Sequence, residues 1–124
     1  MNINIEKLAT LHPKLRLLVL FGSRARGDAR ESSDWDFGYI GERDFDEMAL
    51  YTEIVLALGR DTVDLVDLSR ANGLLRYRAA QDGKLIFEKK KGEYEAFWLQ
   101  AVHFWCDAGL QIRQEYESLL ENLG

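Results

Sequence analysis

Apolar and polar residues follow one another along this chain in blocks that predict alternating strands and helices. The unbroken apolar run Leu17–Phe21 has the length of a buried strand. Further strands are predicted at Trp35–Ile40, Thr62–Leu68 and Lys84–Glu88. Helices are predicted at Ile3–Leu11, at Asp44–Leu58 with an end at Gly59, and at Ala71–Ala80 before an Asp82-Gly83 turn.

The segment Glu93–Leu123 has a near-heptad stripe of apolar residues that predicts one or two amphipathic helices. The stripe consists of Tyr94, Phe97, Trp98, Ala101, Trp105, Ile112, Tyr116, Leu119, Leu120 and Leu123. A sheet must bury its faces, so the favoured interpretation is that this stripe covers one face of the sheet. The alternative is an exposed surface that binds a partner protein.

Together these elements predict an α/β (α+β) fold with one mixed sheet of about four strands packed by helices. A chain of 124 residues, 47% of them hydrophobic, has the size of one compact unit with a real core. We therefore expect a single domain over residues 1–124, with the C-terminal helical segment at 93–123. That size leaves no room for a separate domain that grips a second substrate.

Charge and cysteine content exclude several classes of function. The net charge of −5 opposes direct binding to nucleic acid, which depends on Lys and Arg neutralising phosphates. The only cysteine, Cys106, falls in a predicted helix and is expected to be a core thiol, and neither His12 nor His103 has metal-type spacing. No signal pattern or membrane-length apolar segment is present, so we expect a cytoplasmic protein without membrane contact.

Gly22 and Ser23 lie where the first predicted strand ends and the backbone turns. Glycine lets the main chain approach a ligand closely, and a serine hydroxyl with free backbone N–H groups can bond phosphate oxygens. The turn is therefore a candidate phosphate site.

Ten residues after this turn the chain presents two carboxylates, Asp34 and Asp36, on either side of Trp35. In a strand both acids point to one face, and Trp35 points to the other. Same-side carboxylates repel unless a hard cation such as Mg²⁺ joins them. An Asp-x-Asp pair alone is more often a polar edge strand, but its coupling to the glycine-serine turn favours a metal site.

The motifs Gly22-Ser23-Arg24-Ala25-Arg26-Gly27-Asp28 and Ser33-Asp34-Trp35-Asp36-Phe37 resemble the minimal nucleotidyltransferases of the DNA polymerase β-like superfamily. The resemblance is greatest to the small members that act as antitoxins of HEPN-domain toxins. It implies that Gly22 and Ser23 hold a nucleoside triphosphate and that Asp34 and Asp36 hold metal. Bulky Trp35 departs from the smaller aliphatic residues that are frequent between the two acids.

The resemblance also implies a third carboxylate in the strand Val63–Leu68. Asp64 and Asp67 are three residues apart, so they face opposite sides and at most one joins the metal pair. We choose Asp64, which lies mid-strand at the family position. Asp67 lies near the strand end before Ser69, where a capping or turn role is expected, although a bulge would exchange the two acids.

Three arginines near the turn, Arg24, Arg26 and Arg30, could bind phosphate or simply solvate a loop. Arg24 directly follows the serine and matches the family pattern, so it is the preferred phosphate ligand. Arg26 is the second choice, and Arg30 lies in the variable spacer.

The resemblance implies an Mg²⁺-dependent transfer of AMP from ATP by two metal ions held by Asp34, Asp36 and Asp64. The expected acceptor is a hydroxyl, typically of tyrosine, on a cognate HEPN-domain ribonuclease toxin, which would be silenced in a hetero-oligomer. Two alternatives stay open. One is a non-catalytic antitoxin that acts by occlusion, and the other is a small-molecule nucleotidyltransferase of the aminoglycoside type.

Overall fold

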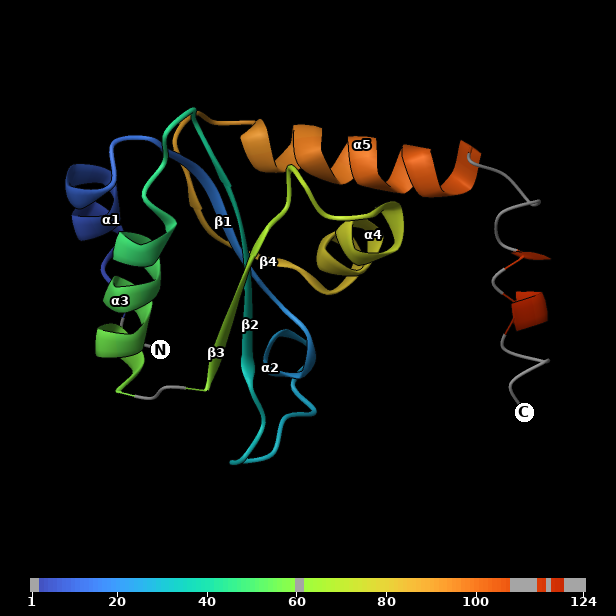
Figure 1. Ribbon diagram of the computed structural model, residues 1–124, viewed down its shortest axis with the longest axis horizontal. Coiled ribbons are helices and arrows are strands. Elements are labelled where there is room, and N and C mark those ends of the chain that lie inside the picture. Colours follow the sequence, from blue (N-terminus) through green and yellow to red (C-terminus); the bar gives the residue numbers. More distant parts are fainter. Residues whose placement is uncertain (1–2, 60–61, 108–113, 116, 120–124) are drawn as a thin grey trace.

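A four-stranded mixed sheet with the strand order β3-β2-β1-β4 forms the centre of the computed structural model (Figure 1). The structure describes residues 3–59, 62–107, 114–115 and 117–119. The strands are β1 (Leu15–Phe21), β2 (Trp35–Gly41), β3 (Val63–Asp67) and β4 (Lys84–Glu88). β1 runs antiparallel to both β2 and β4, and β2 runs parallel to β3. The predicted α+β fold with one mixed sheet is confirmed.

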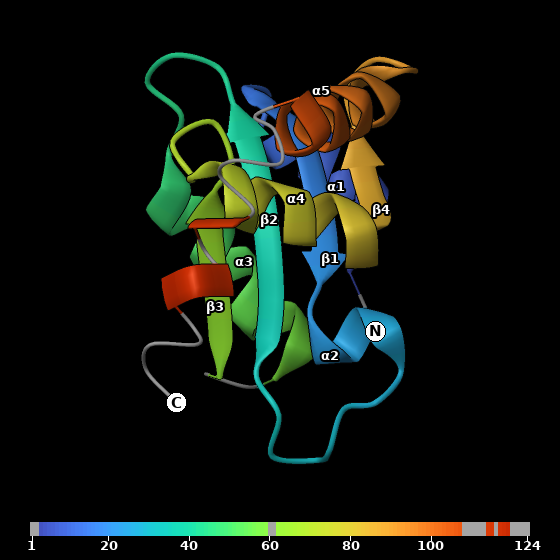
Figure 2. The ribbon, with the colours of Figure 1, turned by 90° about the vertical axis from the view of Figure 1, so that its right-hand side faces the viewer.

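The helices lie on both faces of this sheet (Figures 1 and 2). They are α1 (Ile5–Leu11), α2 (Ser23–Arg26), α3 (Glu47–Leu58), α4 (Gly73–Asp82) and α5 (Glu93–Asp107). Helices α1 and α3 cover one face, and α4 and α5 cover the other. The short α2 lies at the end of β1, to the right of the lower part of the sheet in Figure 1. In the part of the chain described, no helix has the length and apolar character needed to cross a membrane.

Side-chain caps set the helix starts a few residues later than the hydrophobic pattern predicts. Asn4, Asp46 and Asn72 each accept a hydrogen bond from a backbone N–H in the first turn of α1, α3 and α4. Each cap fixes its helix start because it satisfies a donor that the helix itself cannot. Gly59 ends α3 with φ +66°, as the sequence predicts.

Two hydrophobic clusters fill the space on either side of β1, which explains its unbroken apolar run. Leu15, Leu18 and Leu20 pack toward α1 and α3, whereas Leu17 and Val19 pack toward α4 and α5. All five are at least 95% buried. The strand is therefore covered on both faces, and this is what an uninterrupted apolar strand requires.

Helix α5 confirms that the C-terminal stripe covers a sheet face over part of its length. Phe97 and Ala101 are buried against the sheet, and Tyr94 packs beside them. Ile112, Tyr116, Leu120 and Leu123 lie outside the described residues, and Leu119 is exposed. The predicted core position of Cys106 is wrong, because its thiol is exposed. Cys106 lies about half a helical turn around the axis from Phe97 and so points away from the sheet.

Candidate functional site

The turn at Gly22 and Ser23 joins the end of β1 to α2. Gly22 has φ +74° and ψ −159°, a combination that glycine adopts without strain. A Cβ atom built on Gly22 would overlap the Asp36 carboxylate. The glycine therefore permits the backbone turn and also leaves room for the acid. Ser23 is half-buried, and its carbonyl accepts hydrogen bonds from the N–H groups of Gly27 and Asp28 at 3.0 and 3.2 Å.

Strand pairing brings Asp36 and Asp64 together on one face of the sheet. Asp36 is the Cα partner of Asp64 in the parallel β2–β3 ladder and of Phe21 in the antiparallel β1–β2 ladder. Partnered residues point to the same face, so Asp64 lies beside Asp36 near the end of β1. Asp34 is exposed and directly precedes β2. The sheet thus gathers three strand ends at the glycine-serine turn.

Asp67 lies apart from this group, as the sequence predicts. Its Cα partner is Tyr39, and its carboxylate accepts hydrogen bonds from the N–H and the hydroxyl of Ser69 at 3.0 and 2.6 Å. Its second oxygen pairs with Arg70 at 3.6 Å. The expected turn role of Asp67 is confirmed, and Asp64 is the acid that adjoins Asp36.

The electrostatics of Asp36 reflect a concentration of negative charge. Burial raises the pKa of Asp36, and the nearby charges of Asp64 and Asp34 raise it further. Arg26 opposes this increase in the pKa of Asp36. Three carboxylates are therefore close enough to influence one another, and their repulsion is only partly balanced by one cation.

Arg26 connects this edge of the sheet to the end of α4. Its Nη1 lies 2.9 Å from the Asp82 carboxylate, and its Nε lies 3.2 Å from that of Asp28. Hydrogen bonds to these two carboxylates raise the pKa of Arg26. The contact with Asp82 spans 56 residues of sequence, and no motif signals it. Sequence reasoning therefore missed Asp82 as a neighbour of the site.

Arg24 is turned toward the loop between α2 and β2. Its Nη2 donates to the carbonyl oxygens of Glu31 at 3.0 Å and Ser33 at 2.9 Å. Its guanidinium lies over the Trp35 ring, 4.7 Å from the centroid. The guanidinium of Arg24 is thus engaged with the protein itself, and its binding of phosphate stays a prediction.

The residues at this edge fit a hard divalent cation by the chemistry of their donors. Carboxylate oxygens from adjoining strand ends are the ligands that Mg²⁺ prefers, and a cation there would relieve the repulsion that raises the pKa of Asp36. Within the described ranges, no three His, Cys, Asp or Glu side chains are already arranged as a metal-ligand group. Asp34 and Asp64 are exposed, so their side chains are free to adjust toward an ion.

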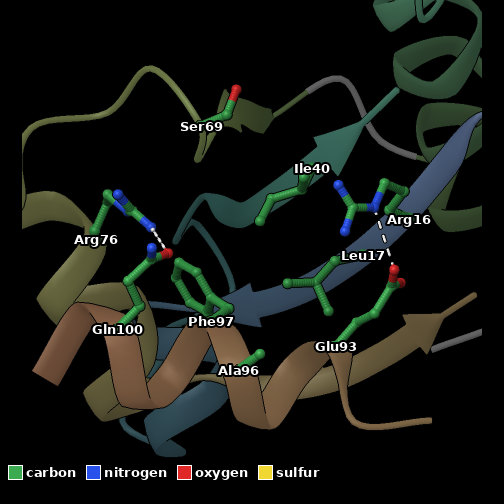
Figure 3. Close-up of a pocket in the computed structure, with 9 residues that line it drawn as sticks. All are labelled: Arg16, Leu17, Ile40, Ser69, Arg76, Glu93, Ala96, Phe97 and Gln100. Atoms are coloured by element: carbon green, nitrogen blue, oxygen red, sulfur yellow. Dashed lines mark hydrogen bonds and ion pairs between the residues drawn. The ribbon is translucent and has the colours of Figure 1, made fainter. Parts of the chain in front are cut away.

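A separate cavity, of about 450 Å³, lies at the opposite end of β1 and β2 (Figure 3). We call it the arginine pocket. It is lined by Arg16, Leu17, Ile40, Ser69, Arg76, Glu93, Ala96, Phe97 and Gln100. Arg16 pairs with Glu93 at 3.1 Å, and Arg76 donates to Gln100 at 3.0 Å. None of the predicted site residues lines this pocket.

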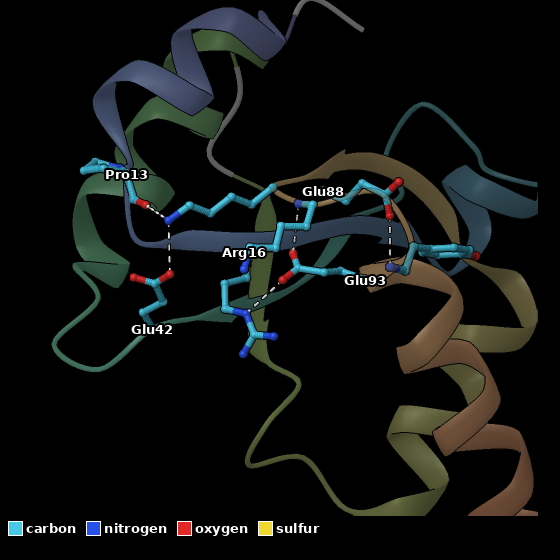
Figure 4. A network of polar contacts seen from close by, with 8 residues as sticks. Pro13, Arg16, Glu42, Glu88 and Glu93 are labelled. Atoms are coloured by element: carbon cyan, nitrogen blue, oxygen red, sulfur yellow. Dashed lines mark hydrogen bonds and ion pairs between the residues drawn. The ribbon is translucent and has the colours of Figure 1, made fainter.

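Polar contacts continue beside the arginine pocket (Figure 4). Lys89 Nζ bonds the carbonyl oxygen of Pro13 at 2.8 Å and the Glu42 carboxylate at 3.1 Å. Glu88 accepts a hydrogen bond from the N–H of Tyr94 at 3.0 Å. Charges at this end are therefore matched with partners of opposite sign or with backbone groups.

Comparison with known proteins agrees with the geometry. Residues 4–92 match the family described as Polymerase beta, Nucleotidyltransferase. A protein adenylyltransferase MntA from Aphanizomenon flos-aquae is 27% identical over 94% of this chain and 83% of its own length. A second MntA, from Shewanella oneidensis, is 31% identical over 75% of this chain and 68% of its own length.

Solved structures extend the likeness to the whole architecture. A chain in the crystal structure of a toxin-antitoxin with AMP-PNP is 25% identical, with a TM-score of 0.71. The match covers 96% of this chain and 94% of that one. The family match includes all four strands, the glycine-serine turn and the three acids of the site. This chain therefore belongs to the polymerase beta nucleotidyltransferase family.

Proposed function

We propose that this protein transfers AMP from ATP to a hydroxyl group, typically of tyrosine, on a cognate HEPN-domain toxin and so acts as its antitoxin. The observation that carries the proposal is the in-register pair Asp36–Asp64 beside the Gly22 turn. The names of the two relatives support a protein acceptor. The AMP-PNP complex of the structural neighbour supports ATP as the donor, and its description as a toxin-antitoxin supports the partner.

Asp34, Asp36 and Asp64 would hold Mg²⁺, most simply two ions. Bound there, the metal neutralises the triphosphate and lowers the pKa of the attacking hydroxyl. Asp36 and Asp64 come from the ends of two paired strands, so the sheet fixes their spacing before any ligand arrives. Gly22 keeps the space beside Asp36 free of side-chain atoms.

The turn would bind the triphosphate next to these acids. Ser23 contributes its hydroxyl, and the glycine lets the backbone approach the β- and γ-phosphate oxygens. The acceptor oxygen then attacks the α-phosphorus as the bond to the β-phosphate oxygen breaks, and pyrophosphate leaves. The hydroxyl proton passes to the exposed carboxylate of Asp64. The protein positions the reactants and forms no covalent intermediate.

The test is incubation of the protein with its cognate HEPN-domain toxin, Mg²⁺ and ATP labelled at either the α- or the γ-phosphate. AMP transfer places only the α-label on the toxin, whereas phosphoryl transfer places only the γ-label. The Asp34→Asn/Asp36→Asn double variant should transfer neither label. Label transfer by this double variant would contradict the assignment of Asp34 and Asp36 to the site of AMP transfer. Toxin neutralisation by the double variant without any transfer would favour occlusion.

A further inference from the structure

We propose that Arg24 is a positioning residue that fixes Asp34 against the glycine-serine turn, and that it does not serve mainly as a phosphate ligand. The inference rests on the proposed function, because it concerns the acids that would hold the metal. It starts from the fact that Arg24 contacts the residues on both sides of Asp34. On one side it binds the carbonyl of Ser33, and on the other it lies over the ring of Trp35.

The loop that carries Asp34 is anchored at its two ends, where the N–H of Asp28 donates to the Ser23 carbonyl at 3.2 Å and the N–H of Trp35 donates to the Thr62 carbonyl at 2.9 Å. The N–H of Arg30 donates to the Ser33 hydroxyl at 2.8 Å, and the N–H of Ser33 donates to the Arg30 carbonyl at 2.9 Å. These two bonds close a turn within the loop but do not tie it to the rest of the fold. The two bonds from Arg24 Nη2, at 3.0 and 2.9 Å, do so, because Arg24 belongs to α2.

Arginine suits this role for geometric reasons. Its planar guanidinium can lie flat on an indole ring while its edge donates to carbonyl oxygens. Arg24 does both, with one face on Trp35 and with Nη2 shared between two carbonyls. Lysine could reach a carbonyl, but it has no flat face to place on the ring.

The position of Arg24 in the sequence links two halves of the site. It directly follows Ser23 in α2, and the groups that it holds directly precede and follow Asp34 (Figure 2 shows α2 and the loop that leads into β2). One side chain therefore links the phosphate-binding turn to the segment that carries the first acid. Asp36 and Asp64 need no such support, because the β2–β3 ladder already fixes their register.

The test is terbium binding, followed by luminescence sensitised by Trp35, which lies between Asp34 and Asp36. Tb³⁺ is a hard, oxygen-seeking ion and serves here as a probe for the proposed Mg²⁺ site. We expect Arg24→Met to raise the dissociation constant at least tenfold and Arg24→Lys to raise it by less. The midpoint of the titration is the readout, because removing the guanidinium also changes the emission of Trp35 itself.

The matched control is Arg30→Met, which removes the same charge from an exposed side chain in the same loop. It should change the terbium dissociation constant by less than twofold. Thermal unfolding of each variant separates loss of fold from loss of affinity, since a merely structural arginine would lower the melting temperature and leave the affinity of the folded protein unchanged.

Two outcomes separate the inference from the proposed function. Wild-type affinity in a folded Arg24→Met variant, with binding lost in Asp34→Asn/Asp36→Asn, would overturn the role of Arg24 alone. Terbium that binds neither the wild type nor any variant would overturn the proposed metal site and this inference together.

Discussion

The two ends of the central strands differ in charge balance, because acids gather at one end and ion pairs form at the other. At the turn end, Asp34, Asp36 and Asp64 gather negative charge, and burial together with the charges of Asp64 and Asp34 raises the pKa of Asp36. At the arginine pocket, the ion pairs Arg16–Glu93 and Lys89–Glu42 match each cation with an acid. Matched charges at a surface contribute little and need no function to explain them. Like charges held together do need an explanation, and binding of a cation supplies one.

This contrast identifies the site better than cavity size does. The arginine pocket has a volume of about 450 Å³, yet its charged groups are engaged with neighbouring side chains, Arg16 with Glu93 and Arg76 with Gln100. The turn end has the unbalanced charge, the glycine without room for a side chain and the family motif. Unbalanced charge at the strand ends therefore indicates the position of the site more clearly than the volume of a cavity does.

The largest expected effect comes from replacing one of the two acids of β3, Asp64, by asparagine. Asp64→Asn should lower the rate of AMP transfer at least about 100-fold, because it removes a carboxylate that would hold the metal and accept the hydroxyl proton. Asp67→Asn is the matched control, since it changes the same residue type in the same strand. Rates from labelled ATP and the cognate toxin provide the measurement. A greater loss in Asp67→Asn than in Asp64→Asn would show that the wrong acid was chosen.

A second large effect is expected at the turn. Gly22→Ala should destabilise the fold by about 1–3 kcal/mol, because its backbone conformation suits only glycine. It should also abolish transfer, since the added methyl group overlaps the Asp36 carboxylate. The control is Gly27→Ala, whose φ of +87° is also positive but whose surroundings are open. We expect Gly27→Ala to lower stability by about 1 kcal/mol with transfer retained.

Urea unfolding combined with the transfer assay distinguishes these two glycine variants. Equal losses of transfer in folded Gly22→Ala and Gly27→Ala would show that crowding of Asp36 is unimportant.

A smaller effect is expected on the free energy of unfolding, which should depend on pH through the titration of Asp36. Burial and the charges of Asp64 and Asp34 raise the pKa of Asp36 in the folded protein. The carboxyl group of Asp36 therefore stays protonated to a higher pH in the folded state than in the unfolded state. The stability linked to this group is therefore greatest below its unfolded pKa of about 4 and declines as pH rises through the raised value. Asn carries no charge, so Asp36→Asn should gain about 0.5 kcal/mol at neutral pH.

Urea unfolding of the wild type and Asp36→Asn near pH 7 and near pH 3 measures this difference. The gain should disappear at the lower pH, where Asp36 is protonated in both states. A gain of the same size at both pH values would show that repulsion among the acids is not its cause.

The smallest effect is expected at the arginine pocket. Arg16→Gln removes an ion pair whose arginine side chain is 48% exposed, so it should cost less than about 1 kcal/mol and leave transfer unchanged. Thermal unfolding and the transfer assay are the measurements. A loss of transfer in a stable Arg16→Gln variant would contradict the division between the two ends.

Much of the fold could be predicted from local signals. The apolar run Leu17–Phe21 predicted a buried strand, and Gly59 marked a helix end. The choice of Asp64 over Asp67 came from the family resemblance and from the strand positions of these two acids, and the parallel ladder places Asp64 beside Asp36. These features depend on residues that are neighbours along the chain or on the alternation of side chains in a strand, so they can be predicted from the sequence.

The rest depends on contacts between distant segments. The strand order, the Arg26–Asp82 pair and the contacts of Arg24 with the loop follow from how the elements pack, and no spacing rule encodes them. The exposure of Cys106 was missed because a lone cysteine in a helix was expected to be buried, although Cys106 lies outside the apolar stripe that faces the sheet. For Arg24, the sequence position after Ser23 predicts a phosphate ligand, and its contacts with the carbonyl oxygens of Glu31 and Ser33 follow only from the fold.

The most direct test of the central claim compares one acid at each end of the strands. Asp36→Asn and Glu93→Gln each remove one negative charge, and both are assayed with the cognate toxin, Mg²⁺ and α-labelled ATP. We expect Glu93→Gln to label the toxin at the wild-type rate and Asp36→Asn, although folded, to leave it unlabelled. Labelling by Asp36→Asn at the wild-type rate would contradict the assignment of the gathered acids as the site of AMP transfer.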